Sequence, residues 1–188
     1  MNLLAVILVG YVLRGVELGL APTIGLGPTG AKDIAPALLL PLVVYVALFA
    51  PAQSVLWLAL CAGIVVDLTG PMTVRGAEAF CWLVGPGAVG YLVAAYFVLT
   101  IRGFMIKRNP LALAVLSLLG AALAGVVAVA IITLRAQFFT DMAWRPGPEL
   151  LLRMGSAVYT GVAALPLSLV FRPLTGMMGL QDSHLRRR

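Results

Sequence analysis

The stretch "IAPALLLPLVVYVALFAPAQSVLWLALCAGIVVDLTGP", residues 34–71, contains two apolar segments separated by Pro51 and no charged residue before Asp67. The first segment, 34–50, has prolines near its start, where the first amides of a helix lack partners in any case. The second segment, 52–69, follows a turn of one or two residues. The stretch therefore predicts two helices that form a tight antiparallel hairpin.

The composition of the whole chain indicates the solvent in which this hairpin folds. Of the 188 residues, 62% are hydrophobic and 11% are charged, and the mean hydropathy is +1.06. Soluble domains have roughly a quarter of their residues charged. Because so few polar residues cannot cover a water-soluble globule, we expect an integral membrane protein.

The expected fold is all-α, a polytopic membrane helical bundle that forms one domain, 1–188. At about 20 residues per crossing, the chain has room for about five or six spans with short loops. Within the fourth span Pro86 falls in the helix interior and predicts a kink. The predicted transmembrane helices cover 2–20, 34–50, 52–69, 77–101, 111–134 and 150–171, and a basic cytoplasmic tail covers 172–188.

The basic residues predict the orientation. With six spans, one side of the membrane carries seven Lys and Arg residues and almost no Asp or Glu. The other side carries five Lys and Arg residues, which are balanced by Asp and Glu. Positive charge favours the cytoplasmic side, so both termini are expected there. The first group is Arg102, Lys107, Arg108, Arg172, Arg186, Arg187 and Arg188, and the second is Lys32, Arg75, Arg135, Arg145 and Arg153. The net charge of +6 favours membrane lipids with anionic headgroups as partners, and no nucleic acid.

Two charged residues interrupt the first span. Arg14 and Glu17 are three positions apart and therefore share one face of a helix. A charge that faces lipid is costly, so we expect the two to pair on a side of the helix that faces protein.

Asp67 lies near the outer end of the third span, followed by Gly70, Pro71, Arg75 and Gly76. It can pair with Arg75, or it can accept hydrogen bonds from free backbone amides at the start of the next span; either would organise the turn. A proton or substrate site is the alternative, but spans 5 and 6 supply no ionisable partner in their interiors.

Residues that would support enzymatic chemistry are scarce. The sequence offers no Ser/His pair, no HExxH and no clustered carboxylates, and the single His184 has no second ligand candidate nearby. We therefore expect no catalytic residues, no metal, no cofactor and no small-molecule ligand.

Three features resemble the rod shape-determining protein MreD family. They are a Gly/Pro-rich loop that leads into the proline-containing segment 31–48, the tight hairpin after it, and the segment "GIVVDLTGPMTVRGAEAF", residues 63–80. This last segment is similar to the family's Gly-x-x-x-Asp-Leu sequence with its Gly-Pro turn and short linker. The matching positions are Gly63, Asp67, Leu68, Gly70, Pro71 and either Gly76 or Ala77.

The resemblance covers about residues 1–135 in span order, and it indicates a divergent member. The family has Pro-Asp before the second span and Pro-Leu-Gly after the turn, whereas this chain has Asp33 with Pro36, and Pro71, Met72 and Thr73. Membership implies a non-enzymatic scaffold of the cell-elongation complex in the bacterial inner membrane. Such a scaffold binds the bitopic protein MreC and helps to couple cytoplasmic filaments to peptidoglycan synthases.

A second class of protein also fits six short apolar helices. The chain is similar to the substrate-binding S-component of an energy-coupling-factor vitamin transporter, which needs polar or aromatic side chains that converge on a pocket. The sequence offers mainly Trp82, Tyr91, Asp141 and Trp144 for that purpose. An unassigned structural membrane protein is the third alternative.

Overall fold

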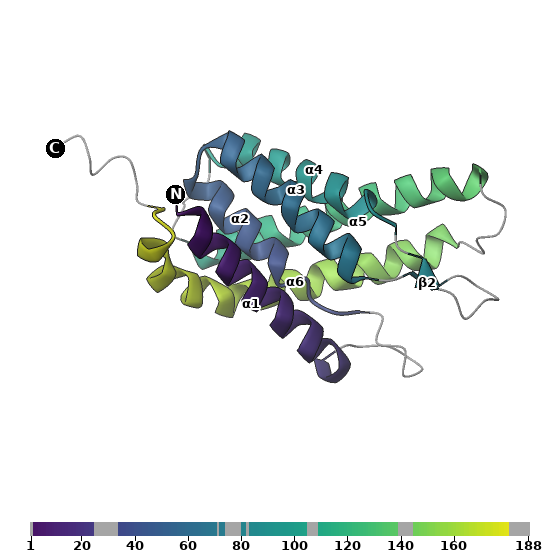
Figure 1. Cartoon of the computed structure of the whole chain (residues 1–188), viewed down its shortest axis with the longest axis horizontal. Coiled ribbons are helices and arrows are strands. Elements are labelled where there is room, and N and C mark those ends of the chain that lie inside the picture. The colour runs from purple at the N-terminus through teal and green to yellow at the C-terminus, as the bar shows by residue number, and fades with distance from the viewer. Residues whose placement is uncertain are drawn as a thin grey trace.

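The structure is a computed structural model in which six helices lie side by side along one long axis (Figure 1). It describes residues 2–24, 34–70, 72–73, 80–81, 83–104, 109–138 and 145–180. A short antiparallel strand pair lies between the third and fourth helices. The elements are α1 (Leu3–Ile24), α2 (Leu39–Phe49), α3 (Ala52–Thr69), β1 (Met72–Thr73), β2 (Phe80–Cys81), α4 (Pro86–Ile101), α5 (Pro110–Phe138) and α6 (Pro146–Met177).

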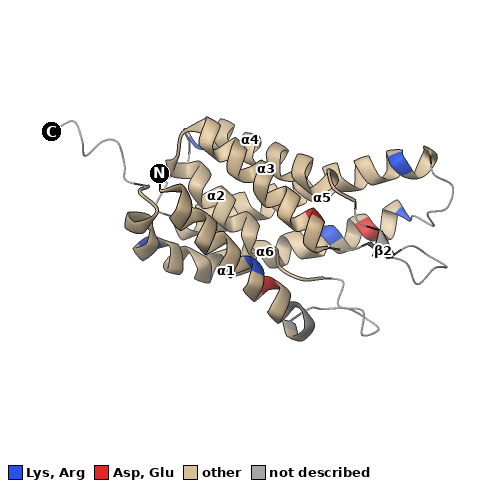
Figure 2. Ribbon diagram, in the orientation of Figure 1, with Lys and Arg blue, Asp and Glu red and all other residues tan. Residues whose placement is uncertain are grey.

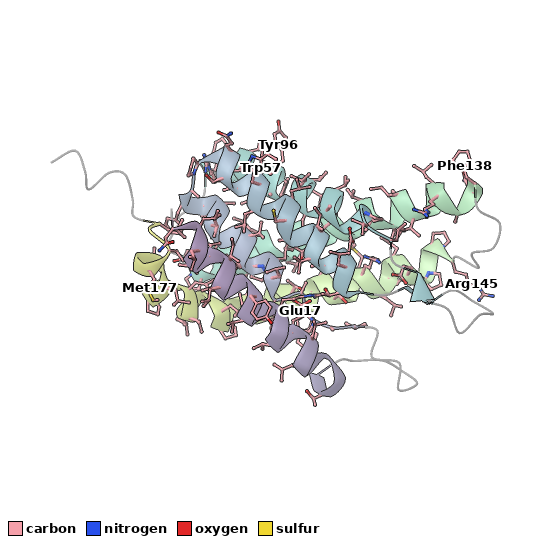
Figure 3. The ribbon with its side chains drawn as sticks, viewed as in Figure 1. Glu17, Trp57, Tyr96, Phe138, Arg145 and Met177 are labelled. Atoms are coloured by element: carbon pink, nitrogen blue, oxygen red, sulfur yellow. The ribbon has the colours of Figure 1, made fainter. Side chains whose placement is uncertain are left out.

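The surface of the bundle suits lipid. Within the described residues, α1, α3, α5 and α6 are long and apolar enough to cross a membrane. Large apolar side chains such as Trp57, Phe138 and Met177 project from the outside of the bundle (Figure 3). Exposed apolar surface of this extent is unfavourable in water. The predicted all-α membrane bundle is therefore confirmed.

The interior is built around α2. Every residue from Leu39 to Leu48 is buried, and α2 contacts each of the other five helices. At about 1.5 Å per residue, its 11 residues extend only about 17 Å, which is much less than the ~30 Å of a hydrocarbon core. The hairpin of α2 and α3 exists as predicted, with Pro51 between them, but its first helix lies inside the bundle and is too short to span the membrane.

Two predicted helix starts are wrong. The span 34–50 becomes helical only at Leu39, and the span 77–101 only at Pro86. Pro86 is the first residue of α4, so it costs no internal hydrogen bond and produces no kink. Gly85, just before it, has φ +134°, a conformation that glycine adopts without steric cost.

Of the remaining helices, α3 has the predicted bounds 52–69, and the other three are longer than the sequence predicted. The predicted spans 2–20, 111–134 and 150–171 correspond to α1, α5 and α6, which end at Ile24, Phe138 and Met177. The first residues of the predicted tail, 172–177, are helical and continue α6. Residues 181–188 of that tail lie outside the described residues.

The two ends of the described chain meet at one end of the bundle. The backbone N–H of Asn2 donates to the carbonyl oxygen of Met178 at 2.8 Å, and the Met178 side chain is buried. Figure 1 shows the start of α1 beside the end of α6. Both ends of the described chain therefore lie at the same end of the bundle.

We predict from the basic residues that this end of the bundle is cytoplasmic. Reporter fusions after Arg108, between α4 and α5, and after Arg188 should both give a cytoplasmic signal. A fusion after Arg145, just before α6, should give the opposite signal and serves as the control. A periplasmic signal from either of the first two fusions would contradict this orientation.

Candidate functional site

Asp67 binds the start of α4. Its Oδ2 accepts the backbone N–H of Gly85 at 2.8 Å and of Ala88 at 3.2 Å, and its Oδ1 accepts that of Gly87 at 2.8 Å. Pro86 has no N–H, and the N–H of Val89 already donates to the Gly85 carbonyl at 2.9 Å. One carboxylate thus satisfies every amide that the first turn of α4 leaves without a helical partner.

Of the two arrangements that the sequence allowed for Asp67, the structure shows the contact with backbone amides. Arg75, the other candidate partner, lies outside the described residues, as do Pro71 and Gly76. Gly70 ends α3 directly after Thr69 and lies at the edge of a cavity beside Asp67.

Gly63 allows this contact to form. It precedes Asp67 by four residues and so lies on the same face of α3. A Cβ at Gly63 would lie 2.7 Å from the carbonyl oxygen of Gly87 and would collide with the backbone of Ala88. The Gly-x-x-x-Asp pattern is therefore a geometric unit, because glycine admits the start of α4 and aspartate binds its amides.

Glu17 performs the same task for α2. Its Oε2 accepts the N–H of Leu38 at 2.9 Å and of Leu39 at 3.3 Å. The Thr160 hydroxyl accepts the N–H of Ala37 at 2.9 Å. Figure 3 places Glu17 well inside the length of the bundle, between the ends marked by Met177 and by Phe138 and Arg145. The start of α2 is therefore held by side chains of α1 and α6.

Arg14 compensates the charge of Glu17. Its Nη1 forms an ion pair with Glu17 Oε1, and its Nε donates to the Thr69 hydroxyl at 2.9 Å. The two charged side chains are only 11% and 12% exposed. The predicted pair is thus present, faces protein, and also connects α1 to the end of α3.

The opposite end of α2 is bound by an arginine. Arg102, just after α4, donates from Nη1 to the carbonyl oxygens of Ala47 at 3.1 Å and Ala50 at 2.7 Å. An acid at the N-terminus of a helix and a cation at its C-terminus both stabilise the helix dipole. From the sequence, Arg102 was expected to contribute only to the orientation in the membrane, and no role was expected for Thr69 or Thr160.

A cavity of about 430 Å³ lies between the starts of α2 and α4, against α5 and α6. Figure 2 shows the acidic positions, in red, between the middle of the bundle and the end that lies away from the N-terminus. In the cavity wall, Glu149 accepts from Arg153 Nε at 2.9 Å. The lining also includes Arg14, Asp67, Gly70, Tyr91, Ser156 and Thr160.

Tyr91 is the unusual member of this lining. The residue is only 6% exposed, and its hydroxyl is buried without a hydrogen-bond partner among the described residues. Trp82, Asp141 and Trp144, the other pocket candidates from the sequence, lie outside the described residues. Within the part of the chain that the structure describes, no three His, Cys, Asp or Glu side chains gather as a metal site would require.

Comparison of the chain with protein-family models, with curated proteins and with solved structures yields no match. The class of protein that the structure defines is a membrane helical bundle with two internally capped helices.

Asp67→Leu is expected to destabilise the bundle, because it leaves three partly buried amides without an acceptor. Each unsatisfied group costs about 1–3 kcal/mol. Asp67→Asn keeps one acceptor oxygen and should cost less. Thermal unfolding in detergent and membrane abundance measure both variants. A leucine variant as stable and abundant as the unmodified protein would show that the amide contact does not support the fold.

Neutralising either Arg14 or Glu17 should cost about 3–5 kcal/mol, since each change leaves a buried charge without its partner. Arg14→Met with Glu17→Gln should therefore cost less than the sum of the single changes. A double-mutant cycle on unfolding free energy measures this coupling.

The pair Arg153 and Glu149 is the matched control for this cycle. Its side chains are 32% and 31% exposed, so a coupling of only about 0.3–0.5 kcal/mol is expected for Arg153→Met with Glu149→Gln. If the effects at Arg14 and Glu17 also add to within about 0.5 kcal/mol, the two do not stabilise each other.

Proposed function

We propose that this protein is a non-enzymatic scaffold of the cell-elongation complex in the bacterial inner membrane, where it takes part in the regulation of cell shape. Its partner in this proposal is a bitopic membrane protein of the MreC kind. The observation that carries the proposal is the junction of α3 and α4. Gly63 and Asp67, central to the MreD-like segment, make this junction through the close approach and the amide contacts described above.

The distribution of charge agrees with a scaffold. Glu17, Asp67 and Glu149 each bind groups of the chain itself, either backbone amides or an arginine. Groups that are satisfied internally hold helices in place and leave the outside of the bundle apolar. An apolar outer surface of this kind suits contact with lipid and with the transmembrane helix of a partner.

A second candidate is the substrate-binding subunit of a vitamin transporter. The observation that favours it is the cavity of about 430 Å³, which falls within the ~300–1,000 Å³ typical of small-molecule sites. In a transporter subunit, substitutions around the cavity would abolish uptake of a small molecule and leave folding intact. The two candidates therefore differ in the proteins that they bind and in the property that a cavity substitution changes.

Affinity purification from bacterial membranes in mild detergent, followed by mass spectrometry, separates the two candidates. Recovery of an MreC-like bitopic protein is expected. Gly63→Ala should reduce this recovery together with protein abundance, because the added methyl group overpacks the α3–α4 junction at a cost of about 1–3 kcal/mol.

Gly103→Ala is the matched control, since a Cβ at Gly103 would meet nothing within 4 Å. It should leave both recovery and abundance unchanged. Recovery of a transporter ATPase pair in place of the bitopic protein would reject the scaffold and support the second candidate.

A further inference from the structure

α6 presents a polar face to the cavity. Four of its polar side chains line the cavity at intervals of three or four residues, and they are Glu149, Arg153, Ser156 and Thr160. This spacing places them on one side of the helix. The side chains of Glu149 and Arg153 are 31% and 32% exposed. Because contact between a charged group and hydrocarbon is costly, this part of the cavity has to be open to water or to polar groups.

Arg153 is held in place by two contacts. Its Nε donates to Oε1 of Glu149 at 2.9 Å. Its stem packs against Gly125 of α5, where a Cβ would lie 3.2 Å from Arg153 Cβ and 3.8 Å from Arg153 Cδ. The two Nη groups of Arg153 and Oε2 of Glu149 make no hydrogen bond within the described part of the chain. A guanidinium has five N–H donors in a fixed plane, so this pair offers donors and an acceptor side by side.

The other polar side chains of the described lining are already engaged. Arg14 forms its ion pair with Glu17, and Asp67 accepts from the amides of α4. The Thr160 hydroxyl accepts the N–H of Ala37 at 2.9 Å. The Arg153–Glu149 pair is therefore the charged part of the wall that can bind a ligand without the loss of a contact that holds α2 or α4.

The charge of the described lining determines which ligand this pair can bind. The net charge is zero, because Arg14 and Arg153 balance Asp67 and Glu149. A ligand with only a negative charge would be attracted by Arg153 and repelled by the adjacent Glu149, and a ligand with only a positive charge would meet the reverse. In both cases the repulsion offsets the attraction. A ligand with both charges meets an opposite charge at each of them.

We propose that the Arg153–Glu149 pair binds a small zwitterion in this cavity. An anionic oxygen of the ligand accepts from the Nη groups of Arg153, and its primary ammonium group donates to Oε2 of Glu149. Either of two sources supplies this chemistry: the phosphoethanolamine headgroup of a membrane lipid, or a free water-borne zwitterion. The cavity, at about 430 Å³, has room for such a group. The proposal goes beyond the scaffold function and holds whichever partner the protein binds.

Glycerophosphoethanolamine is a suitable probe, because it is soluble in water and carries one phosphate and one primary ammonium group. Isothermal titration calorimetry on the full chain, delipidated and in an uncharged detergent, should show saturable binding. Glycerol phosphate and ethanolamine each carry only one of the two charged groups. Each should bind at least about 10-fold more weakly than the probe, because one charge-assisted hydrogen bond is lost.

Arg153→Met and Glu149→Gln should each weaken binding of the probe by about 10-fold or more. The unfolding temperature should change little, because an ion pair exposed to this extent contributes little to stability. Glu149→Gln should also reverse the preference, so that glycerol phosphate binds more tightly than the probe, since Arg153 then lacks its neighbouring negative charge. Arg145→Met is the matched control, because Arg145 is exposed just before α6 and lies outside the cavity lining. It should leave binding unchanged.

The composition of the membrane identifies the source of the zwitterion. The titration is repeated in nanodiscs of phosphatidylglycerol, with and without phosphatidylethanolamine. If the lipid headgroup is the ligand, phosphatidylethanolamine should prevent binding of the probe. If the ligand is water-borne, the lipid should leave binding of the probe unchanged.

Three outcomes would overturn the proposal. The first is that the probe shows no saturable binding to the unmodified protein. The second is that glycerol phosphate or ethanolamine binds this protein as tightly as the probe does. The third is that neither Arg153→Met nor Glu149→Gln lowers the affinity for the probe. None of these measurements involves an MreC-like partner, so the zwitterion site and the scaffold function fail independently.

Discussion

Backbone amides at the start of a helix have no partners within that helix, and lipid offers none. The bundle depends on how this constraint is met at two places. α2 and α4 both begin inside the protein, and each receives a carboxylate from the preceding long helix, Glu17 from α1 and Asp67 from α3. These two carboxylates position the short helices, and the cavity lies between them.

The two caps differ in how their negative charge is compensated. Asp67 accepts hydrogen bonds from the amides of three residues, which can approach closely because Gly63 has no side chain. Glu17 accepts hydrogen bonds from only two amides, and the ion pair with Arg14 compensates the remainder of its negative charge. Arg102 then binds the far end of α2, so the innermost helix is held by an acid at one end and a cation at the other. This places the strongest polar contacts of the protein around its most apolar helix.

Hydropathy was sufficient to predict the helices, their number and the α2–α3 hairpin, because long apolar runs dominate the sequence. The starts of α2 and α4 were missed for a physical reason. The groups that satisfy them come from Glu17 and Asp67, which lie 21 and 18 residues earlier than Leu38 and Gly85. The residues next to each helix start do not indicate such distant contacts. An apolar segment with prolines is equally compatible with a helix that starts earlier in the sequence.

The site was predictable in part. The spacing of Arg14 and Glu17 predicted their ion pair, and the position of Asp67 predicted two arrangements, of which the structure shows one. The cavity was not expected, because its apolar wall is made of alanine and glycine, which in a sequence indicate close helix packing. Tyr91 was a pocket candidate from the sequence, but only the packing of α4 shows that its hydroxyl lacks a partner.

The helices differ in length and therefore respond differently to the thickness of the bilayer. At about 1.5 Å per residue, the 29 residues of α5 and the 32 of α6 extend about 44 and 48 Å, so they exceed a ~30 Å hydrocarbon core and must tilt or protrude. α2 is surrounded by protein and does not experience the mismatch. A thinner or thicker membrane therefore changes the tilt of the outer helices, while the innermost helix keeps its caps.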